Sequence, residues 1–199
     1  MSTEMKTVIV FNHPYEGSFC NAILSSVTRG LKNGNHEIDL IHLDKEGFNP
    51  VMSAEDLKGF KERRAVDPKV LEYKERIKEA EHLILIFPIW WELMPAMTKG
   101  FIDKVIFPGV AYNYTQKGFM KKNFLKLNRV TLLTTMNSAS FFYRLLFGNA
   151  IKKAVLLGTF WKTGYKHRKW INLSMVKFVS DKKRKKWLYK IEKHFERLN

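Results

Sequence analysis

Two tryptophans stand between two prolines, directly after a continuous apolar run in the middle of the chain. The run covers residues 83–87 and reads LILIF, and Trp90 and Trp91 lie between Pro88 and Pro95. Such a run is typical of a strand buried on both faces, and Pro88 ends it because proline cannot donate to a central strand ladder. The rigid loop and its aromatic surface suit a flat, conjugated ligand. From the spacing alone, tryptophans that plug the core are an equally good interpretation.

A second loop offers groups that could hold an anion. It joins a predicted strand at residues 6–11 to a helix that Ser18 can cap, and it contains His13 and Gly17. The first N–H groups of a helix have no partner within it and favour negative charge, so a phosphate is the expected ligand. The loop has neither the Gly-Lys-Ser/Thr of a nucleoside triphosphatase nor the Gly-x-Gly-x-x-Gly of a dinucleotide site. Taken alone, His13 could equally cap its own loop.

A third candidate loop follows the apolar strand predicted at residues 129–134. Its sequence is TTMNS, from Thr134 to Ser138. The carboxyl ends of parallel strands meet at one edge of a sheet, where open α/β sheets bind their ligands. We therefore expect this loop to face the same crevice as the two tryptophans.

The elements that would position these loops alternate along the chain. Strand patterns cover residues 6–11, 37–43, 83–87, 129–134 and 169–173, the last at a sheet edge. Helical patterns start at Ser18 and after Pro95, cover 54–64, 68–80 and 140–162 with a kink at Gly148, and end with a helix capped by Asp181. Residues 108–127 are predicted to be a long loop, and loops of this length usually have a function. The alternation predicts one α/β domain over residues 1–199, with a five-stranded parallel sheet in the order 2-1-3-4-5 and helices on both faces.

Composition limits what the chain can be. With 199 residues, 45% of them hydrophobic, the chain can form one domain with a sizeable core. One cysteine and no apolar leader favour a cytoplasmic protein without membrane insertion. The net charge of +16 could attract nucleic acid or phosphorylated ligands, but no nucleic-acid-binding signature accompanies it, so no nucleic-acid partner is expected. The six histidines are scattered, and no metal site is expected.

The central segment resembles a known family. Residues 87–112, FPIWWELMPAMTKGFIDKVIFPGVAY, are similar to the flavin-binding segment of the NAD(P)H:quinone oxidoreductases. The resemblance implies a flavodoxin-like fold that binds a flavin non-covalently, with FAD preferred and FMN as the alternative. It also implies hydride transfer from NAD(P)H to the flavin and two-electron transfer to a quinone or similar small electrophile, in a homodimer with its sites at the interface. The basic surface weakly favours NADPH over NADH.

By this resemblance, three groups of residues hold the flavin. They are His13, Gly17, Ser18, Phe19 and Cys20; Pro88, Ile89, Trp90, Trp91 and Glu92; and Thr134, Thr135, Met136, Asn137 and Ser138. Tyr112 and Tyr114 match the family's substrate-pocket tyrosines and could reach the neighbouring subunit's site. Tyrosines that cover a sheet edge would have the same spacing.

The chain departs from the family pattern in three places. Cys20 stands where the family has asparagine, and we expect it to be a small buried side chain rather than a redox thiol. Met136 and Asn137 replace two glycines, so their side chains would crowd the approach to the ring. No histidine follows Tyr143 where some relatives have one, which leaves Tyr143 as the only candidate for a catalytic side chain.

Two other functions stay open. Some relatives bind flavin and nucleotide yet regulate a partner protein such as a potassium-efflux channel, and the departures at Met136 and Asn137 are compatible with that role. The basic charge alone would permit nucleic-acid binding. The lysines at residues 182–186 oppose the dipole of the helix they begin, so we interpret them as a charged solvent face.

Overall fold

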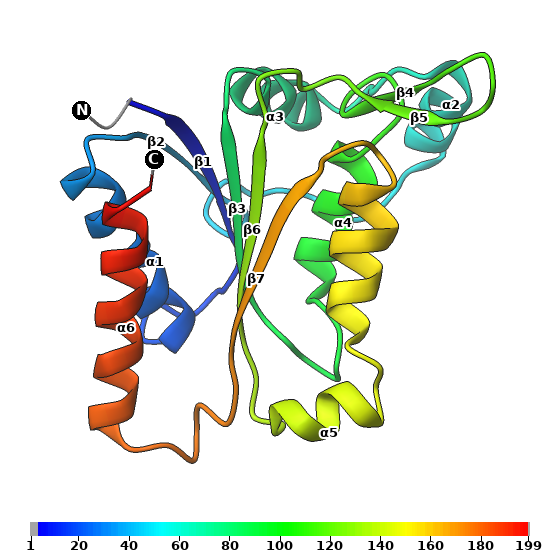
Figure 1. The fold of residues 1–199 in the computed structure, drawn as a ribbon. Helices are drawn as coiled ribbons and strands as arrows, with labels where there is room; N and C mark the ends of the chain where they lie inside the picture. The colour runs from blue at the N-terminus through cyan, green and yellow to red at the C-terminus, as the bar shows by residue number, and fades with distance from the viewer. Residues whose placement is uncertain (1–3, 199) are drawn as a thin grey trace.

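The centre of the molecule is a sheet of five parallel strands. The computed structural model describes residues 4–198. The strands are β1 (Lys6–Phe11), β2 (Glu37–His42), β3 (His82–Pro88), β6 (Arg129–Thr135) and β7 (His167–Leu173). Their order across the sheet is β2-β1-β3-β6-β7, with every neighbouring pair parallel (Figure 1). The predicted order is therefore confirmed, with the fifth predicted strand at one edge as β7.

Helices cover both faces of this sheet (Figure 1). One face carries α1 (Phe19–Asn33) and α6 (Asp181–Glu196). The other carries α3 (Pro68–Lys78), α4 (Ala96–Val105) and the π-helix η1 (Lys152–Trp161). Alternate residues of β3 enter two separate apolar cores, one on each face, and all seven are buried. This double burial explains why the strand reads as an unbroken apolar run.

Side-chain caps fix where several helices begin. Ser18 Oγ accepts from the N–H of Asn21 at the start of α1, as predicted. For the last helix the predicted cap is wrong, because Ser180 and not Asp181 occupies the extended cap position and accepts from the N–H of Lys183. Asp181 lies in the first turn instead, where a carboxylate interacts favourably with the helix dipole.

The segment predicted as a long loop contains a small hairpin. The antiparallel strands β4 (Tyr112–Tyr114) and β5 (Met120–Lys122) pair here, and Gly118 supplies the left-handed backbone, φ +78°, that their turn needs. The hairpin lies near α2 (Ala54–Glu62), at the amino ends of the sheet strands (Figure 1).

Residues 140–162 form two helices instead of one. The first is α5 (Ser140–Leu145) and the second is η1. Gly148, at φ +58°, separates them, which confirms the predicted break. In Figure 1, α5 lies across the end of the molecule at which the sheet strands finish.

Candidate functional site

The three predicted loops meet at the carboxyl edge of the sheet. They surround a shallow hollow of about 180 Å³. Its lining consists of His13, Pro88, Ile89, Trp90, Thr135, Met136, Asn137 and Val176. Seven of these eight residues are predicted ligand contacts from three separate segments. Val176 was not predicted; it belongs to the loop after β7, which topology alone would bring to this edge.

A strained turn presents the tryptophans beside this hollow. Trp90 and Leu93 exchange two backbone hydrogen bonds, with N···O distances of 2.9 and 3.0 Å, and the two residues between them have φ of +49° for Trp91 and +64° for Glu92. Residues other than glycine rarely adopt this conformation, and each one costs roughly 1 kcal/mol or more. Trp91 is 98% exposed, so the interpretation that it plugs the core is wrong. The turn instead holds the Trp91 ring out in solvent, next to Trp90, which lines the hollow.

Hydrogen bonds from Ser138 and Tyr143 stabilise this turn. The Oγ of Ser138 donates to Glu92 Oε1 at 2.7 Å, and the hydroxyl of Tyr143 donates to the Glu92 carbonyl at 2.9 Å. The N–H of Ile151 in turn donates to the Tyr143 hydroxyl at 3.0 Å. Glu92 Oε2 is buried and has no hydrogen-bond partner among the described residues. The carboxyl group of Glu92 therefore links the turn to the loop after β6 through one oxygen, and its other oxygen is free to accept a hydrogen bond.

Tyr143 itself lies behind the turn and not in the lining of the hollow. Its side chain is buried, and this burial raises the pKa of its hydroxyl. Both hydrogen bonds of the hydroxyl serve to position backbone groups. A direct catalytic role for Tyr143 stays a prediction.

The loop after β6 is pinned to its neighbours. Thr134 Oγ1 donates to Asn172 Oδ1 and accepts from the indole N–H of Trp170, both at 2.8 Å, so this side chain points along the sheet and away from the hollow. Met136 pairs by its backbone with Leu173 and Val176. Its side chain is almost fully buried in the core, which limits the crowding expected from the loss of a glycine.

Hydrogen bonds hold the loop before α1 in place. His13 Nδ1 accepts from the N–H of Tyr15 at 3.1 Å, and burial lowers the pKa of the imidazole. Because Nδ1 accepts this bond, Nε2 is the nitrogen that carries the proton in the neutral ring. Asn12, which was not predicted, fixes the start of the loop: it donates to Asp44 Oδ2 at 3.0 Å and accepts from Thr98 at 2.8 Å.

The remaining predicted contacts of this loop have structural roles. Phe19 is half-buried and packs beside Trp187, with 6.4 Å between ring centroids. Cys20 is buried with its Sγ 3.3 Å from Thr135 Oγ1, and burial raises the pKa of the thiol to about 11. The expectation of a small buried side chain is confirmed. A Cβ at Gly17 would lie 2.4 Å from the Tyr15 hydroxyl oxygen, so any other residue there would require the exposed Tyr15 ring to shift.

The two predicted substrate-pocket tyrosines are not at this hollow. Tyr112 and Tyr114 lie on β4, at the amino end of the sheet in the same chain (Figure 1). Their rings meet edge to face at 5.5 Å, and Arg63 lies over the Tyr114 ring. Within one chain they pack against the edge of the domain.

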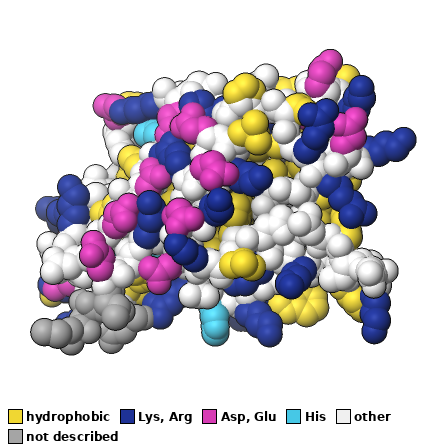
Figure 2. Space-filling model, turned by 90° about the horizontal axis from the view of Figure 1, so that it is seen from above, with side chains coloured by type: hydrophobic (Ala, Val, Ile, Leu, Met, Phe, Trp, Pro, Cys, Tyr) yellow, Lys and Arg dark blue, Asp and Glu magenta, His cyan; other side chains and the backbone are white. Residues whose placement is uncertain are grey.

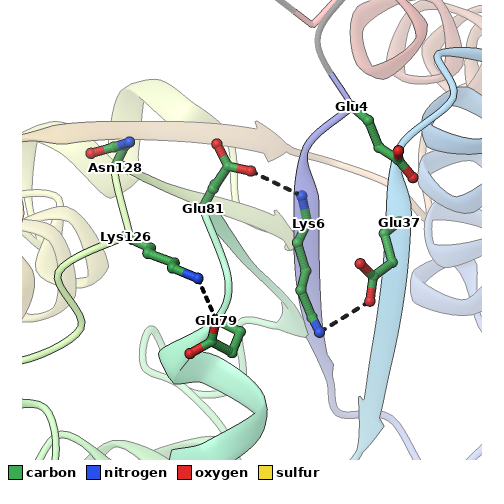
Figure 3. Close-up of a pocket in the computed structure, with 7 residues that line it drawn as sticks. All are labelled: Glu4, Lys6, Glu37, Glu79, Glu81, Lys126 and Asn128. Carbon is green, nitrogen blue, oxygen red and sulfur yellow. Dashed lines mark hydrogen bonds and ion pairs between the residues drawn. The ribbon is translucent and has the colours of Figure 1, made fainter.

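A larger hollow lies at the amino ends of the strands, far from the tryptophans. It measures about 640 Å³, and Figure 3 shows its charged lining. Lys6 pairs with Glu37 at 3.0 Å, and Lys126 pairs with Glu79. Four glutamates and two lysines line it, so its net charge is negative, and size alone does not make this hollow a candidate site for a phosphate-bearing ligand. Among residues 4–198, no group of three or more metal-ligating side chains is found.

No helix within the described part of the chain is both long enough and apolar enough to span a membrane.

Comparisons with known proteins agree with this geometry. The chain is 31% identical over 105 residues to YcaK, an uncharacterized NAD(P)H oxidoreductase of Escherichia coli, covering 52% of this chain and 54% of that protein. It is 30% identical over 101 residues to an FMN-dependent NADH:quinone oxidoreductase of Clostridium perfringens, covering 48% and 50%. The chain thus spans about half the length of the curated relatives it matches.

A solved structure matches the whole chain. The NAD(P)H:quinone oxidoreductase from Methanothermobacter marburgensis superposes with a TM-score of 0.87 at 25% identity, covering 99% of this chain and 100% of that one. A family model described as a flavodoxin-like fold matches residues 5–195. Five parallel strands in this order, with the candidate site at their carboxyl edge, and a match over nearly the full length make the chain a member of the flavodoxin-like fold family.

Proposed function

We propose that this protein is an NAD(P)H oxidoreductase that uses a bound flavin to pass two electrons to a quinone or similar small electrophile. The observation that carries the proposal is the Trp90–Leu93 turn, which keeps a fully exposed indole beside a polar-edged hollow at the cost of two left-handed residues. Backbone strain of this kind persists where the surrounding structure enforces it, and it concentrates at functional sites.

The residues present fit a flavin. The hollow is smaller than the roughly 300 Å³ at which enclosed ligand sites begin, so it suits the edge of a flat ring whose face stays open. The Nε2–H of His13 and the loop at Asn137 supply polar groups near that edge, and the amino end of α1 faces the same side for phosphate. A flavin bound there would supply the hydride-accepting and electron-donating chemistry.

The side chains around the hollow would bind and orient the flavin. Trp90 and Trp91 provide aromatic surface for stacking, and the bonds from Ser138 and Tyr143 hold that surface in place. An open ring face would let NAD(P)H and the acceptor use one position in turn. The cofactor is either FAD, which the resemblance favours, or FMN, which is named for the Clostridium perfringens relative.

We infer a homodimer as the working form. Tyr112 and Tyr114 lie at the end of the chain opposite the hollow, so they would reach a site only on a second copy. Exposed apolar side chains on the same side of the molecule, Leu157 and Trp161 on η1 and Phe119 beside β5, would suit the contact. The single buried thiol of Cys20 supports a cytoplasmic location.

Absorption spectra of the purified protein, before and after anaerobic addition of NADPH, test the proposal. We expect flavin bands that bleach, and chromatography of the released cofactor separates FAD from FMN. Bands that bleach with neither NADPH nor NADH would favour a regulatory module. A protein that binds no flavin even after reconstitution would refute the proposal.

A further inference from the structure

A basic hollow lies at the amino ends of the strands, where β6 and β7 meet the end of α6. It measures about 330 Å³, a size typical of sites for small ligands. Its lining consists of His82, Arg129, Val130, Thr131, His167, Arg168, Lys169, His194 and Leu198. Among the described residues, three histidines and three lysine or arginine side chains line this basic hollow, and no aspartate or glutamate does. Residues 104–180, which include β6 and β7, contain no acidic residue at all.

The register of the sheet brings these side chains together. His82 on β3, Arg129 on β6 and His167 on β7 are Cα partners in one row. Thr131 and Lys169 are Cα partners two residues further along. Side chains alternate between the two faces of a strand, and these five have the same parity as the strand residues packed against α1 and α6. They therefore stand on one face of the sheet, the face that α6 covers (Figure 1).

Lys169 contacts another basic group in this hollow. Its Nζ lies 3.0 Å from Nε2 of His194. An ammonium group can only donate, so the imidazole accepts. Burial, together with the positive charges of Lys169 and Arg129, lowers the pKa of His194 and keeps the ring neutral at neutral pH. The ammonium thus has a neutral ring as its hydrogen-bond partner, and its charge remains available to an anion.

The carboxylates that are near in the chain belong to other contacts. On α6, Glu192 pairs with Arg29 at 2.9 Å, and Glu196 pairs with Lys193 at 2.7 Å. Glu81 lines the acidic hollow of Figure 3. Figure 2 looks onto this end of the molecule and shows acidic side chains interspersed with basic ones over much of the view, but none along its lower right edge. These carboxylates are thus engaged away from the lining of the basic hollow.

His82 has one ring nitrogen without a partner. The residue is 1% exposed, and its Nε2 shares a hydrogen bond of 2.8 Å with Thr131 Oγ1. Its Nδ1 is buried and has no hydrogen-bond partner among the described residues. Buried polar atoms are nearly always paired, so an unpaired one on a residue that lines a hollow points to a ligand. With the Thr131 hydroxyl donating to Nε2, Nδ1 carries the proton and offers a hydrogen bond.

The lining fits an anion better than a metal ion or a nucleic-acid strand. Arg129 and Lys169 repel a cation, and Nε2 of both His82 and His194 is already engaged. Among residues 4–198, no three metal-ligating side chains are grouped closely enough to hold a metal ion. A hollow of this volume with a buried donor accommodates one small group, whereas a nucleic-acid backbone needs an extended track of cations.

We propose that the basic hollow binds a phosphate group, either as free phosphate or as the monoester of a small molecule. Arg129 and Lys169 would balance its charge, and the Nδ1–H of His82 would donate to one of its oxygens. The inferred contact between two copies involves η1 and the hairpin, whereas the basic hollow lies on the α6 face of the sheet, so a second copy leaves it open (Figure 1). The site lies at the opposite end of the strands from the candidate flavin site and does not rest on the proposed function.

Calorimetric titration of the full chain, saturated with flavin and kept in a phosphate-free buffer, tests the site. We expect one phosphate to bind per chain. Glycerol 3-phosphate separates the two sources of the group: tighter binding than free phosphate assigns a monoester, and weaker binding assigns the free anion. Glycerol is the uncharged control and should not bind.

Neutralising one cation should weaken this binding. Lys169→Gln, at an exposed position, should raise the Kd for phosphate about tenfold, because it removes a charge-assisted hydrogen bond. Lys58→Gln, at an exposed position on α2, is the matched control and should bind like the wild type. Equal affinity in the two variants would overturn the proposal, as would wild-type protein that binds no phosphate at roughly 10 mM. A DNA oligonucleotide that binds where phosphate does not would likewise contradict it.

Nitrogen NMR of the histidine rings tests the buried donor. Phosphate should change the Nδ1 chemical shift of His82, and His82→Gln identifies that signal by its loss. His42, on β2, is the distant control ring and should keep its shifts. An unchanged His82 signal in phosphate-bound protein would refute the assigned donor. Phosphate binding by a protein that cannot bind flavin would refute the proposed enzyme and leave this site intact.

Discussion

At the scale of single residues, two side chains have an environment opposite to what their type suggests. Trp91 is a large apolar residue held in solvent, and His82 is an ionisable residue held in the core. His82 Nε2 shares a hydrogen bond of 2.8 Å with Thr131 Oγ1, and its Nδ1 has no partner among the described residues. Each contrast leads to a measurement.

Replacing Trp91 with alanine should weaken flavin binding without changing the stability of the fold. Because the indole is 98% exposed, Trp91→Ala should change the free energy of unfolding by less than about 0.5 kcal/mol. Loss of stacking surface should weaken flavin binding by about tenfold, measured by equilibrium dialysis. Tyr189→Ala, at a 61% exposed position on α6, is the control and should leave flavin affinity unchanged. Equal affinity in both variants would show that Trp91 does not contact the cofactor.

His82 should make the fold sensitive to mild acid. Burial lowers the pKa of its imidazole to about 3, and the charge of Arg129 and neighbouring histidines adds to the shift. Between that pKa and the ordinary 6.5, the unfolded chain binds a proton that the folded chain does not, so stability falls as pH decreases. Urea unfolding at pH 7 and pH 5 should differ by about 1–2 kcal/mol from this residue. His82→Gln should reduce that difference, whereas His167→Gln at an exposed strand end should not.

At the scale of elements, connections between segments far apart in sequence place the loops. Lys104 at the end of α4 is buried and pairs with Asp67 at 2.6 Å and with Asp56 at 3.3 Å, so it links α4 to the starts of α3 and α2. Gly109 brings the hairpin against α2: a Cβ there would lie 1.7 Å from the Arg63 carbonyl oxygen. The Lys104 ion pairs thus fix the helices to one another, and the close approach at Gly109 fixes the place of the hairpin against α2.

Two glycines with the same backbone conformation should respond differently to alanine. Gly109 has φ +82° and Gly118 has φ +78°, but open space surrounds Gly118. Gly118→Ala should cost roughly 1 kcal/mol from backbone strain alone. Gly109→Ala must also displace backbone and should cost about 3 kcal/mol or more, measured by chemical denaturation. Similar losses would mean that the hairpin can shift away from α2.

The order of the sheet strands could be predicted from the sequence, but the β4–β5 hairpin and the strained turn could not. Strand order followed from the alternation of apolar runs with amphipathic stretches, and the three candidate loops met as the topology requires. The β4–β5 hairpin escaped prediction because its strands are three residues long and carry no alternating apolar pattern. The distance of Tyr112 and Tyr114 from the hollow could not be predicted, since it depends on where the hairpin packs. Likewise, no pattern indicates that Trp91 and Glu92 adopt left-handed backbone.

At the scale of the whole molecule, two apolar cores share one sheet. Because β3 and β6 contribute to both cores, neither layer of helices can separate without exposing the strands. The excess positive charge, by contrast, is unevenly placed, and the acid-free segment runs through the hairpin, α5, η1 and β7.

This shared sheet predicts one cooperative unit over the whole chain. Thermal unfolding of the flavin-free protein should give coincident transitions by far-ultraviolet circular dichroism and tryptophan fluorescence. The calorimetric and van't Hoff enthalpies should agree, as for a two-state domain. Two separated transitions would mean that the helices on one face unfold independently.

The burial of Cys20 has a practical consequence for studying the protein. A thiol whose pKa lies near 11 and which is almost fully enclosed stays protonated at neutral pH, so maleimide reagents should leave it untouched. The native chain then serves as an unreactive background. A single engineered position such as Leu146→Cys would be the one site of attachment for a spin label or fluorophore, with no need to remove the natural cysteine.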